Sequence, residues 1–207
     1  MDDAARIRDY WFGSEPLTAQ TFAERAQLWF GKDSETSEGR HARDEEISAR
    51  FGPLLERAAR GELSSWAGSP RRRLSLIVLL DQFSRNIYRG TPRAFTQDAQ
   101  ALELALTGIQ AAADAALDCA ERLFFYMPLQ HAESLEIQEE SLAAFRRLIA
   151  EAPEELHASL QPALDSATVH HDIVKRFGRF PHRNRVVGRA STPEERSFIA
   201  ANADFGQ

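Results

Sequence analysis

Residues 154–178, EELHASLQPALDSATVHHDIVKRFG, form the stretch of sequence that decides the fold class. Its apolar residues recur at the three- to four-residue spacing of one helix face, with no alternation of the kind that marks a strand. They are Leu156, Leu160, Leu164, Ala167 and Val174. Glycine is the usual residue just beyond a helix end, so Gly178 is expected to cap this helix. The stretch therefore predicts one long amphipathic helix.

The same periodicity continues on both sides of this stretch. It predicts helices at about 4–12, 18–30, 36–60, 70–88, 99–113, 119–149 and 192–202. Proline should break or kink the third of these at Pro53 and the sixth at Pro128. No linker or long run of β-branched alternation interrupts the pattern. We therefore expect an all-α, single-domain array of about eight to ten helices.

Short signals mark several helix ends. Thr192-Pro193-Glu194-Glu195 fits a capping box, with the threonine at the cap and a glutamate three residues on. Ser69-Pro70 is a similar start signal. Trp11-Phe12-Gly13 and Trp29-Phe30-Gly31 repeat one pattern, which we interpret as aromatic core residues followed by glycine C-caps.

Composition places the chain among globular proteins. Of its 207 residues, 43% are hydrophobic and 27% charged, values typical of a folded domain. The longest apolar run, Leu74–Leu80, is far shorter than the roughly 20 residues of a membrane span. One cysteine excludes an internal disulfide and, with an acidic N-terminus unlike a signal peptide, favours the cytoplasm.

Charge is distributed unevenly along the chain. The formal net charge is −6, yet residues 175–189 contain one lysine and five arginines with no acid, so the remainder carries −6 − 6 = −12. An acidic remainder would repel a polyanion, which argues against nucleic-acid binding. A basic island in such a chain favours a small anionic ligand.

The first polar segment is DQFSRNIYRG, residues 81–90. Asp81, Arg85 and Arg89 lie four residues apart on a predicted helix, opposite the face that carries Leu80, and Asn86 occupies the neighbouring row. Such a row is commonly an exposed series of ion pairs, each stabilising by about 0.3–0.5 kcal/mol. The alternative is the polar face of a binding site.

The second segment, YMPLQHAE at residues 126–133, places Tyr126, His131 and Glu133 around a proline. A helix kink there would open space for a site. His131 is expected to point inward, where it is either a core histidine or an acid–base group, and Glu133 to lie on another side of the helix.

The third segment, residues 169–184, carries the densest signal. Its turn holds Arg176, Arg179 and Arg183 around Phe177 and Phe180. Guanidinium groups suit phosphate or carboxylate. They also form cation–π and capping contacts, which is the structural alternative. The other polar candidates of this segment are His170, His182 and Asn184.

Motifs for common chemistries are absent from the sequence. Zinc would require ligands such as His131, Glu133, His170 and His182, but their spacing fits no zinc motif, so we expect neither a metal nor another cofactor. No Walker loop, dinucleotide-binding glycine fingerprint or nucleophile elbow is present.

Four segments together resemble a known family. They are Tyr10–Gly13, Leu79–Thr91, Tyr126–Leu129 and Arg176–Asn184. In this order they are similar to the bacterial family called domain of unknown function 924. The resemblance implies an all-helical fold related to tetratricopeptide-like helical hairpins and supplies no reaction, ligand or catalytic residue. The family pattern usually has Ser-Glu after the histidine of the second segment, where this chain has Ala132-Glu133.

Two functions are compatible with these observations. One is a small-molecule binding protein or enzyme with an arginine- and histidine-rich pocket for an anionic ligand. Its candidate acid–base residues are Asp81, His131, Glu133, His170 and His182, and its candidate ligand-binding residues are Arg85, Asn86, Arg89, Tyr126, Arg176, Arg179, Arg183 and Asn184. The other is a helical scaffold for a partner protein, in which these motifs are structural. For the first we expect the arginines of the 175–189 turn to meet the Asp81–Arg89 face. The oligomeric state has no signal in the sequence.

Overall fold

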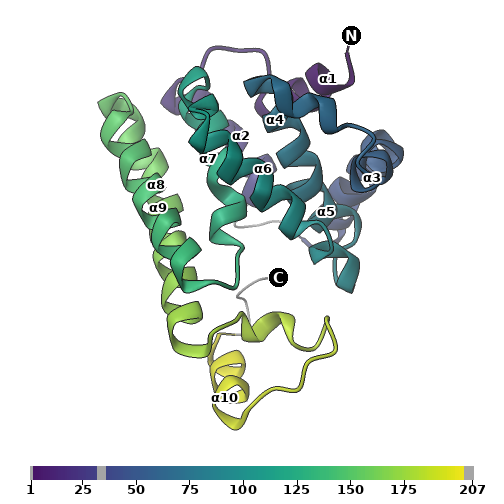
Figure 1. The fold of residues 1–207 in the computed structure, drawn as a ribbon, viewed down its shortest axis with the longest axis vertical. Coiled ribbons are helices and arrows are strands. Elements are labelled where there is room, and N and C mark those ends of the chain that lie inside the picture. The colour runs from purple at the N-terminus through teal and green to yellow at the C-terminus, as the bar shows by residue number, and fades with distance from the viewer. Residues whose placement is uncertain (1, 32–35, 203–207) are drawn as a thin grey trace.

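The computed structural model describes residues 2–31 and 36–202. Within these ranges every regular element is helical and no strand occurs, which confirms the all-α fold as a single array (Figure 1). The α-helices are α1 (Asp3–Phe12), α2 (Ala19–Phe30), α3 (Ser37–Ala59), α4 (Pro70–Ile77), α5 (Ser84–Ile87), α6 (Asp98–Gln110), α7 (Cys119–Gln130), α8 (Leu135–Glu151), α9 (Glu154–Phe177) and α10 (Pro193–Ala201).

The predicted helix at 70–88 is the buried centre of the array. It consists of α4, a π-helical stretch (Val78–Phe83) and α5, and every residue from Leu74 to Asp81 is buried. Helices α1, α3, α6 and α7 pack around it. Asp81 is fully buried and the Arg85 side chain is only 19% exposed. The alternative of an exposed ion-pair row is therefore wrong for its Asp81 end.

Aromatic residues fill the space where α1 and α2 meet the centre. Trp11 and Trp29 are buried, and the Trp29 indole donates a hydrogen bond of 2.8 Å to the Trp11 carbonyl. Phe124 packs edge-on against both rings. The aromatic core residues are thus confirmed for the two tryptophans. Phe30 departs from the expectation, because its side chain is 58% exposed.

Two predicted proline interruptions have different outcomes. Helix α3 runs through Pro53 without a break, since Ile47, Phe51 and Leu55 on its inner face stay packed in the core. Pro128 also lies within a helix, but α7 ends two residues later at Gln130. The chain then turns before α8, so the interruption expected near Pro128 occurs at residues 131–134, and His131 caps α7.

The C-terminal part begins with the longest hairpin. Helices α8 and α9 lie side by side along much of their length (Figure 1). Gly178 caps α9 with φ of +70° and donates to the Val174 carbonyl, as expected. A short 3-10 turn (Pro181–Arg183) follows, and α10 begins with the predicted capping box at Thr192 and Glu195.

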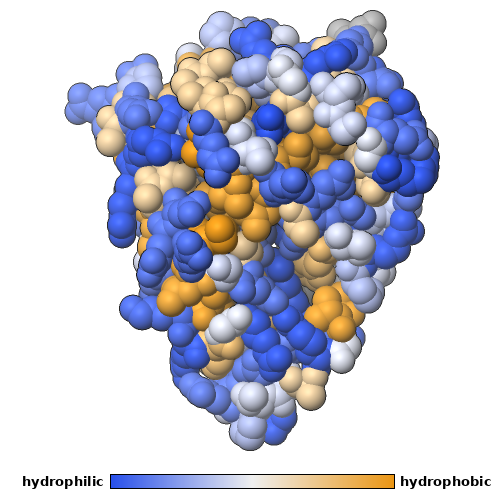
Figure 2. Space-filling view, viewed as in Figure 1, coloured by the Kyte–Doolittle hydropathy of each residue, from blue (hydrophilic) through white to orange (hydrophobic). Residues whose placement is uncertain are grey.

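The surface mixes apolar and hydrophilic side chains. In the view of Figure 2, orange apolar patches lie between blue hydrophilic ones over the face that carries α7 and α8. Among the described helices, none is both long enough and apolar enough to span a bilayer.

Candidate functional site

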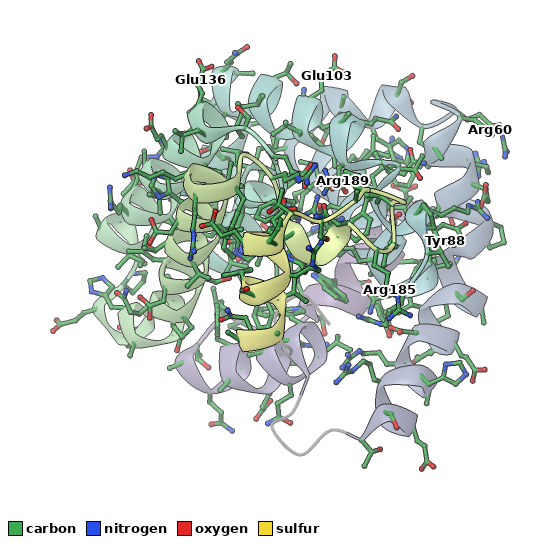
Figure 3. All side chains as sticks on the ribbon, turned by 90° about the horizontal axis from the view of Figure 1, so that it is seen from below. Arg60, Tyr88, Glu103, Glu136, Arg185 and Arg189 are labelled. Carbon is green, nitrogen blue, oxygen red and sulfur yellow. The ribbon has the colours of Figure 1, made fainter. Side chains whose placement is uncertain are left out.

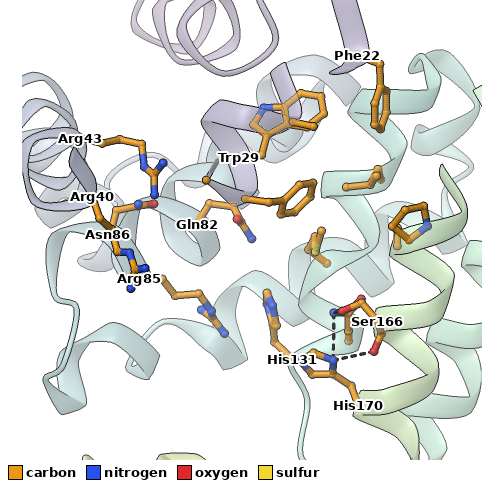
Figure 4. Close-up of a pocket in the computed structure, with 18 of the residues that line it drawn as sticks. Phe22, Trp29, Arg40, Arg43, Gln82, Arg85, Asn86, His131, Ser166 and His170 are labelled. Carbon is orange, nitrogen blue, oxygen red and sulfur yellow. Dashed lines mark hydrogen bonds between the residues drawn. The ribbon is translucent and has the colours of Figure 1, made fainter. Parts of the chain in front are cut away.

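A cavity of about 630 Å³ lies beside the buried central helix, between α2, α3, α7 and α9 (Figure 4). Its polar wall carries cationic and hydrogen-bonding groups: Arg40, Arg43, Gln82, Arg85, Asn86 and Arg89. Its apolar wall is made by α2, α7 and α9: Phe22, Ala26, Trp29, Phe30, Leu123, Met127, Pro162 and Ala163. His131, His170 and Ser166 line the end shown at the bottom of Figure 4, and Gln130, Gly31 and Ser159 also line the cavity.

Asp81 and His131 form a pair at the edge of this cavity. The His131 Nδ1 lies 2.7 Å from Asp81 Oδ1, and the Asp81 side chain is fully buried. Gln82 donates to the other carboxylate oxygen at 2.6 Å, and the Arg85 guanidinium lies 3.2 Å from Asp81. Asp81 lies in the π-helical stretch Val78–Phe83, a distortion frequently found at functional sites.

The electrostatics of the pair favour an aspartate anion and a neutral imidazole. Burial alone would raise the pKa of Asp81, but the charge of Arg85 and the contact with His131 outweigh it and hold that pKa below its usual value. Burial, aided by Arg85, lowers the pKa of His131 even though Asp81 opposes it. With Nδ1 bonded to Asp81, the neutral ring keeps its acceptor lone pair on Nε2.

A chain of ion pairs leads from Asp81 to the C-terminal turn. Arg85 binds Asp98 through two hydrogen bonds of 2.8 and 3.1 Å, and Arg183 reaches the same carboxylate at 3.2 Å. Burial and the charge of Arg85 lower the pKa of Arg183 to about 10. Arg183 also lies over the rings of Phe95 and Phe180, the cation–π arrangement considered for this turn. These contacts hold Arg183 in the fold.

The polar wall is built from α3 and α5. Asn86 and Arg89 both bind Asp44, Arg89 at 2.6 Å, which fixes them across the two helices. Arg40 and Arg43 project from α3 into the same space (Figure 4). Among the described residues, every ionisable side chain that lines the cavity is an arginine or a histidine. The described lining therefore presents guanidinium and imidazole groups to the cavity.

His170 lies at the same end of the cavity as His131, with ring centroids 6.3 Å apart. Its Nδ1 contacts the Ser166 carbonyl at 2.8 Å, one helical turn earlier. Burial lowers its pKa to about 3, so the ring is neutral at neutral pH. Gln130 joins the group through a 3.0 Å hydrogen bond to Ser166.

None of the five arginines of the 175–189 turn lines this cavity. Three of them pair with carboxylates elsewhere: Arg176 with Glu194, Arg179 with Glu195, and Arg189 with Glu133. In Figure 3, Arg189 lies toward the middle of the molecule, whereas Arg60, Glu103 and Glu136 project from its rim. The carboxylates that reach the arginines of this turn are therefore Asp98, Glu133, Glu194 and Glu195.

Four further sequence candidates lie outside the main cavity. Tyr126 is buried and donates to Asp114 at 2.5 Å. Asn184 is buried against Glu195, and the ring of His182 lies against Phe180. Glu133 and Arg183 line a separate cavity of about 410 Å³, which also includes His131. The cavities thus meet at His131.

Several cavity residues have no individual signal in the sequence. Arg40 and Arg43 sit in a helix rich in charges of both signs, so nothing separates them from a solvated face. Phe22, Trp29 and Phe30 fit the pattern of core residues, and nothing in the sequence of α2 marked it as part of a binding site. Among the described residues, no three histidine, cysteine, aspartate or glutamate side chains are arranged to hold a metal ion.

Comparisons with known proteins agree on the family. The family model described as "Bacterial protein of unknown function (DUF924)" matches residues 7–203. A solved structure of a protein of unknown function from Agrobacterium tumefaciens is 35% identical, with a TM-score of 0.77, and the match covers 96% of this chain and 97% of that one. No curated protein matches the chain. The resemblance seen in the four motifs is therefore confirmed, and the chain belongs to the bacterial family of unknown function DUF924.

Proposed function

We propose that the main cavity binds a small organic or inorganic anion. The observation that carries this proposal is the ionisable lining, which within residues 2–31 and 36–202 consists of four arginines and two histidines with no carboxylate among them. Asp81 and Asp44 lie behind this surface and hold its arginines, but they do not present their charges to the cavity lining. An arginine fork binds carboxylate or phosphate through paired, charge-assisted hydrogen bonds.

The test is thermal unfolding in different salts at matched ionic strength. A ligand that binds only the folded state raises the melting temperature by mass action, so sulfate, phosphate or acetate should raise it more than chloride does. Arg40→Gln and Arg43→Gln should each reduce this increment. Arg60→Gln is the matched control, because Arg60 follows the far end of α3, is 59% exposed and lines none of this cavity.

The Arg179→Ala variant distinguishes between two locations of the anion site, the main cavity and the C-terminal turn. Arg179 is bound to Glu195 at 2.6 Å and lies outside the cavity lining, so the increment should persist in this variant. If the increment disappears in Arg179→Ala and persists in Arg40→Gln and Arg43→Gln, the anion site is in the turn. If no anion exceeds chloride, the motifs are structural and the scaffold function is favoured.

The Asp81–His131 pair favours an enzyme over a passive carrier. A carboxylate bonded to Nδ1 orients the imidazole and stabilises the imidazolium that forms when Nε2 accepts a proton, as in general-base catalysis. His131 would take a proton from the bound ligand or a water beside it, and the buried Asp81 would hold the resulting charge.

Site-resolved acylation by diethyl pyrocarbonate tests this second function, because the reagent modifies neutral imidazoles that are accessible. His131 should be modified at neutral pH, and sulfate should protect it. His41, which is 74% exposed, provides the internal standard and should be unaffected by sulfate. A His131 that is unreactive under conditions that modify His41 has no accessible Nε2, which contradicts the base role.

A further inference from the structure

We infer that the ligand of the main cavity is an amphiphilic anion, with an acidic head against the polar wall and an apolar body against the apolar wall. This inference rests on the proposed anion site and specifies the class of molecule it takes. The two walls belong to different elements, so the cavity has a charged side and an apolar side (Figure 4). Phe22 lies on the opposite side from Arg40, Arg43 and Asn86, and Trp29 lies between them.

The size of the cavity supports an organic body attached to the head. At about 30 Å³ for each water-sized group, 630 Å³ accommodates roughly twenty such groups. An inorganic sulfate or phosphate would fill a small part of this space and leave the apolar wall uncovered. Pockets of this volume ordinarily bury most of the surface of a drug-sized organic ligand.

The exposure of the Phe30 side chain is a second, independent observation that supports an apolar ligand body. It is 58% exposed although its neighbour Trp29 is buried, and it is one of three large hydrophobic side chains that are exposed among the described residues. Phe30 stands in the lining of the cavity, whereas the other two, Leu135 and Val169, do not. Its ring is parallel to that of Phe124 with centroids 6.1 Å apart, which extends the aromatic surface of α7 toward the opening. An apolar body in the cavity would cover this ring.

The geometry assigns one orientation to the ligand. Arg85 and Arg89 are held by Asp98 and Asp44, so their guanidinium groups are already positioned for the head. Met127 and Leu123 on α7, with Pro162 and Ala163 on α9, offer surfaces without hydrogen-bonding side chains to the remainder of the molecule. Affinity should therefore depend on the length of the apolar body as well as on the charge of the head.

A series of straight-chain alkyl sulfates, from ethyl to octyl and kept below the concentration at which micelles form, tests this dependence. Binding is measured by calorimetry and by the fluorescence of Trp29, with Trp29→Phe as the blank. The dissociation constant should fall about fourfold for each added methylene, which is the value expected for complete transfer from water. Octanol, which has the body without the charge, should bind more weakly than octyl sulfate.

Variants test the contributions of the apolar wall and the polar wall to binding separately. Phe30→Ser should reduce the gain per methylene at the long end of the series, whereas Leu135→Ser, an equivalent change at an exposed site on α8, should not. Arg40→Gln should weaken every member by a similar factor.

Each outcome decides one of the two proposals. If all chain lengths bind equally, or if Phe30→Ser retains the full gain per methylene, the amphiphile is excluded while the anion site stands. If neither inorganic sulfate nor any alkyl sulfate binds, the anion site itself is excluded.

Discussion

Asp81 is the residue on which most of the candidate site depends. Its buried carboxylate contacts His131, Gln82 and Arg85, which come from the central helix and from the end of α7. It therefore aligns the imidazole and compensates the charge of a largely buried guanidinium at the same time. Removing one partner of such a buried pair leaves the other charge uncompensated.

Asp81→Asn should destabilise the protein by about 3–5 kcal/mol, the range for breaking a buried ion pair. The measurement is the free energy of unfolding in urea at pH 7. Asp165→Asn is the control, because Asp165 is exposed on α9 and should change that free energy by less than about 0.5 kcal/mol. Similar values for the two variants would contradict the role given to Asp81.

His170 and His182 make the stability depend on pH. Burial lowers their pKa values to about 3 and about 4, against 6.5 in the unfolded chain. Below pH 6.5 the unfolded chain therefore binds protons that the folded protein does not, and the free energy of unfolding should decline as pH falls toward 4. Urea unfolding at pH 7 and pH 5 measures this decline, and His170→Asn/His182→Asn should flatten it. An unchanged slope in the double variant would contradict the assignment.

Among the elements, α9 and α3 show when local sequence decides where a helix ends and when packing does. Gly178 ends α9 in the left-handed region, at φ of +70°, as its sequence predicts. Gly52 and Pro53 do not end α3, because the inner face of that helix is anchored in the core on both sides of them. A capping signal at a helix end was decisive, and a breaking signal within a packed helix was not.

Gly178→Ala and Gly52→Ala should therefore change the stability in opposite directions. A Cβ at Gly178 meets no atom within 4 Å, so its cost is the left-handed backbone, about 1–2 kcal/mol. A Cβ at Gly52 makes an ordinary contact of 3.8 Å with Ser48, and alanine should stabilise the helix by about 0.5–1 kcal/mol. Thermal unfolding of both variants provides the measurement. A Gly178→Ala variant as stable as the parent would exclude backbone strain at this cap.

The same contrast explains which features of the fold and of the candidate site could be predicted from the sequence. Periodicity predicted the helices because each needs only its own residues, and α9 and α10 have the expected caps. The burial of Asp81 depends on helices distant in the sequence that pack around the central helix, so the four-residue spacing alone did not predict it. Of the sequence candidates, Arg85, Asn86, Arg89, His131 and His170 line the cavity. Its other half, on α2 and α3, became apparent only from the packing.

At the scale of the whole molecule, the charged C-terminal turn is bound to the array through the pairs of Arg183 with Asp98 and of Arg189 with Glu133, and Glu195 holds it together internally. Glu195 accepts hydrogen bonds from Arg179 and Asn184 and caps α10 through the Thr192 backbone. The hydrogen bonds from Arg179 lower the pKa of Glu195 to about 2. The contact therefore persists through the neutral and mildly acidic range.

Glu195→Gln should loosen this part without disturbing the cavity. Hydrogen exchange should become faster over residues 181–202, while the exchange of α4 and α7 and the response to sulfate stay unchanged. Glu194→Gln is the control, because Glu194 is 61% exposed and contacts only the exposed Arg176. Faster exchange in α7 as well would mean that the C-terminal turn supports the cavity directly.

The position of the apolar wall has a consequence for biosynthesis. One side of the cavity comes from α2, near the start of the chain, and the side that faces it includes Ser166 and His170 on α9. A nascent chain therefore exposes Trp29 and Phe30 long before the ribosome has released the residues that enclose them. Contacts between such distant segments form late, because the loop between them must first be closed. The binding site is completed near the end of translation, so a truncated product would keep most of its helices and lack the cavity.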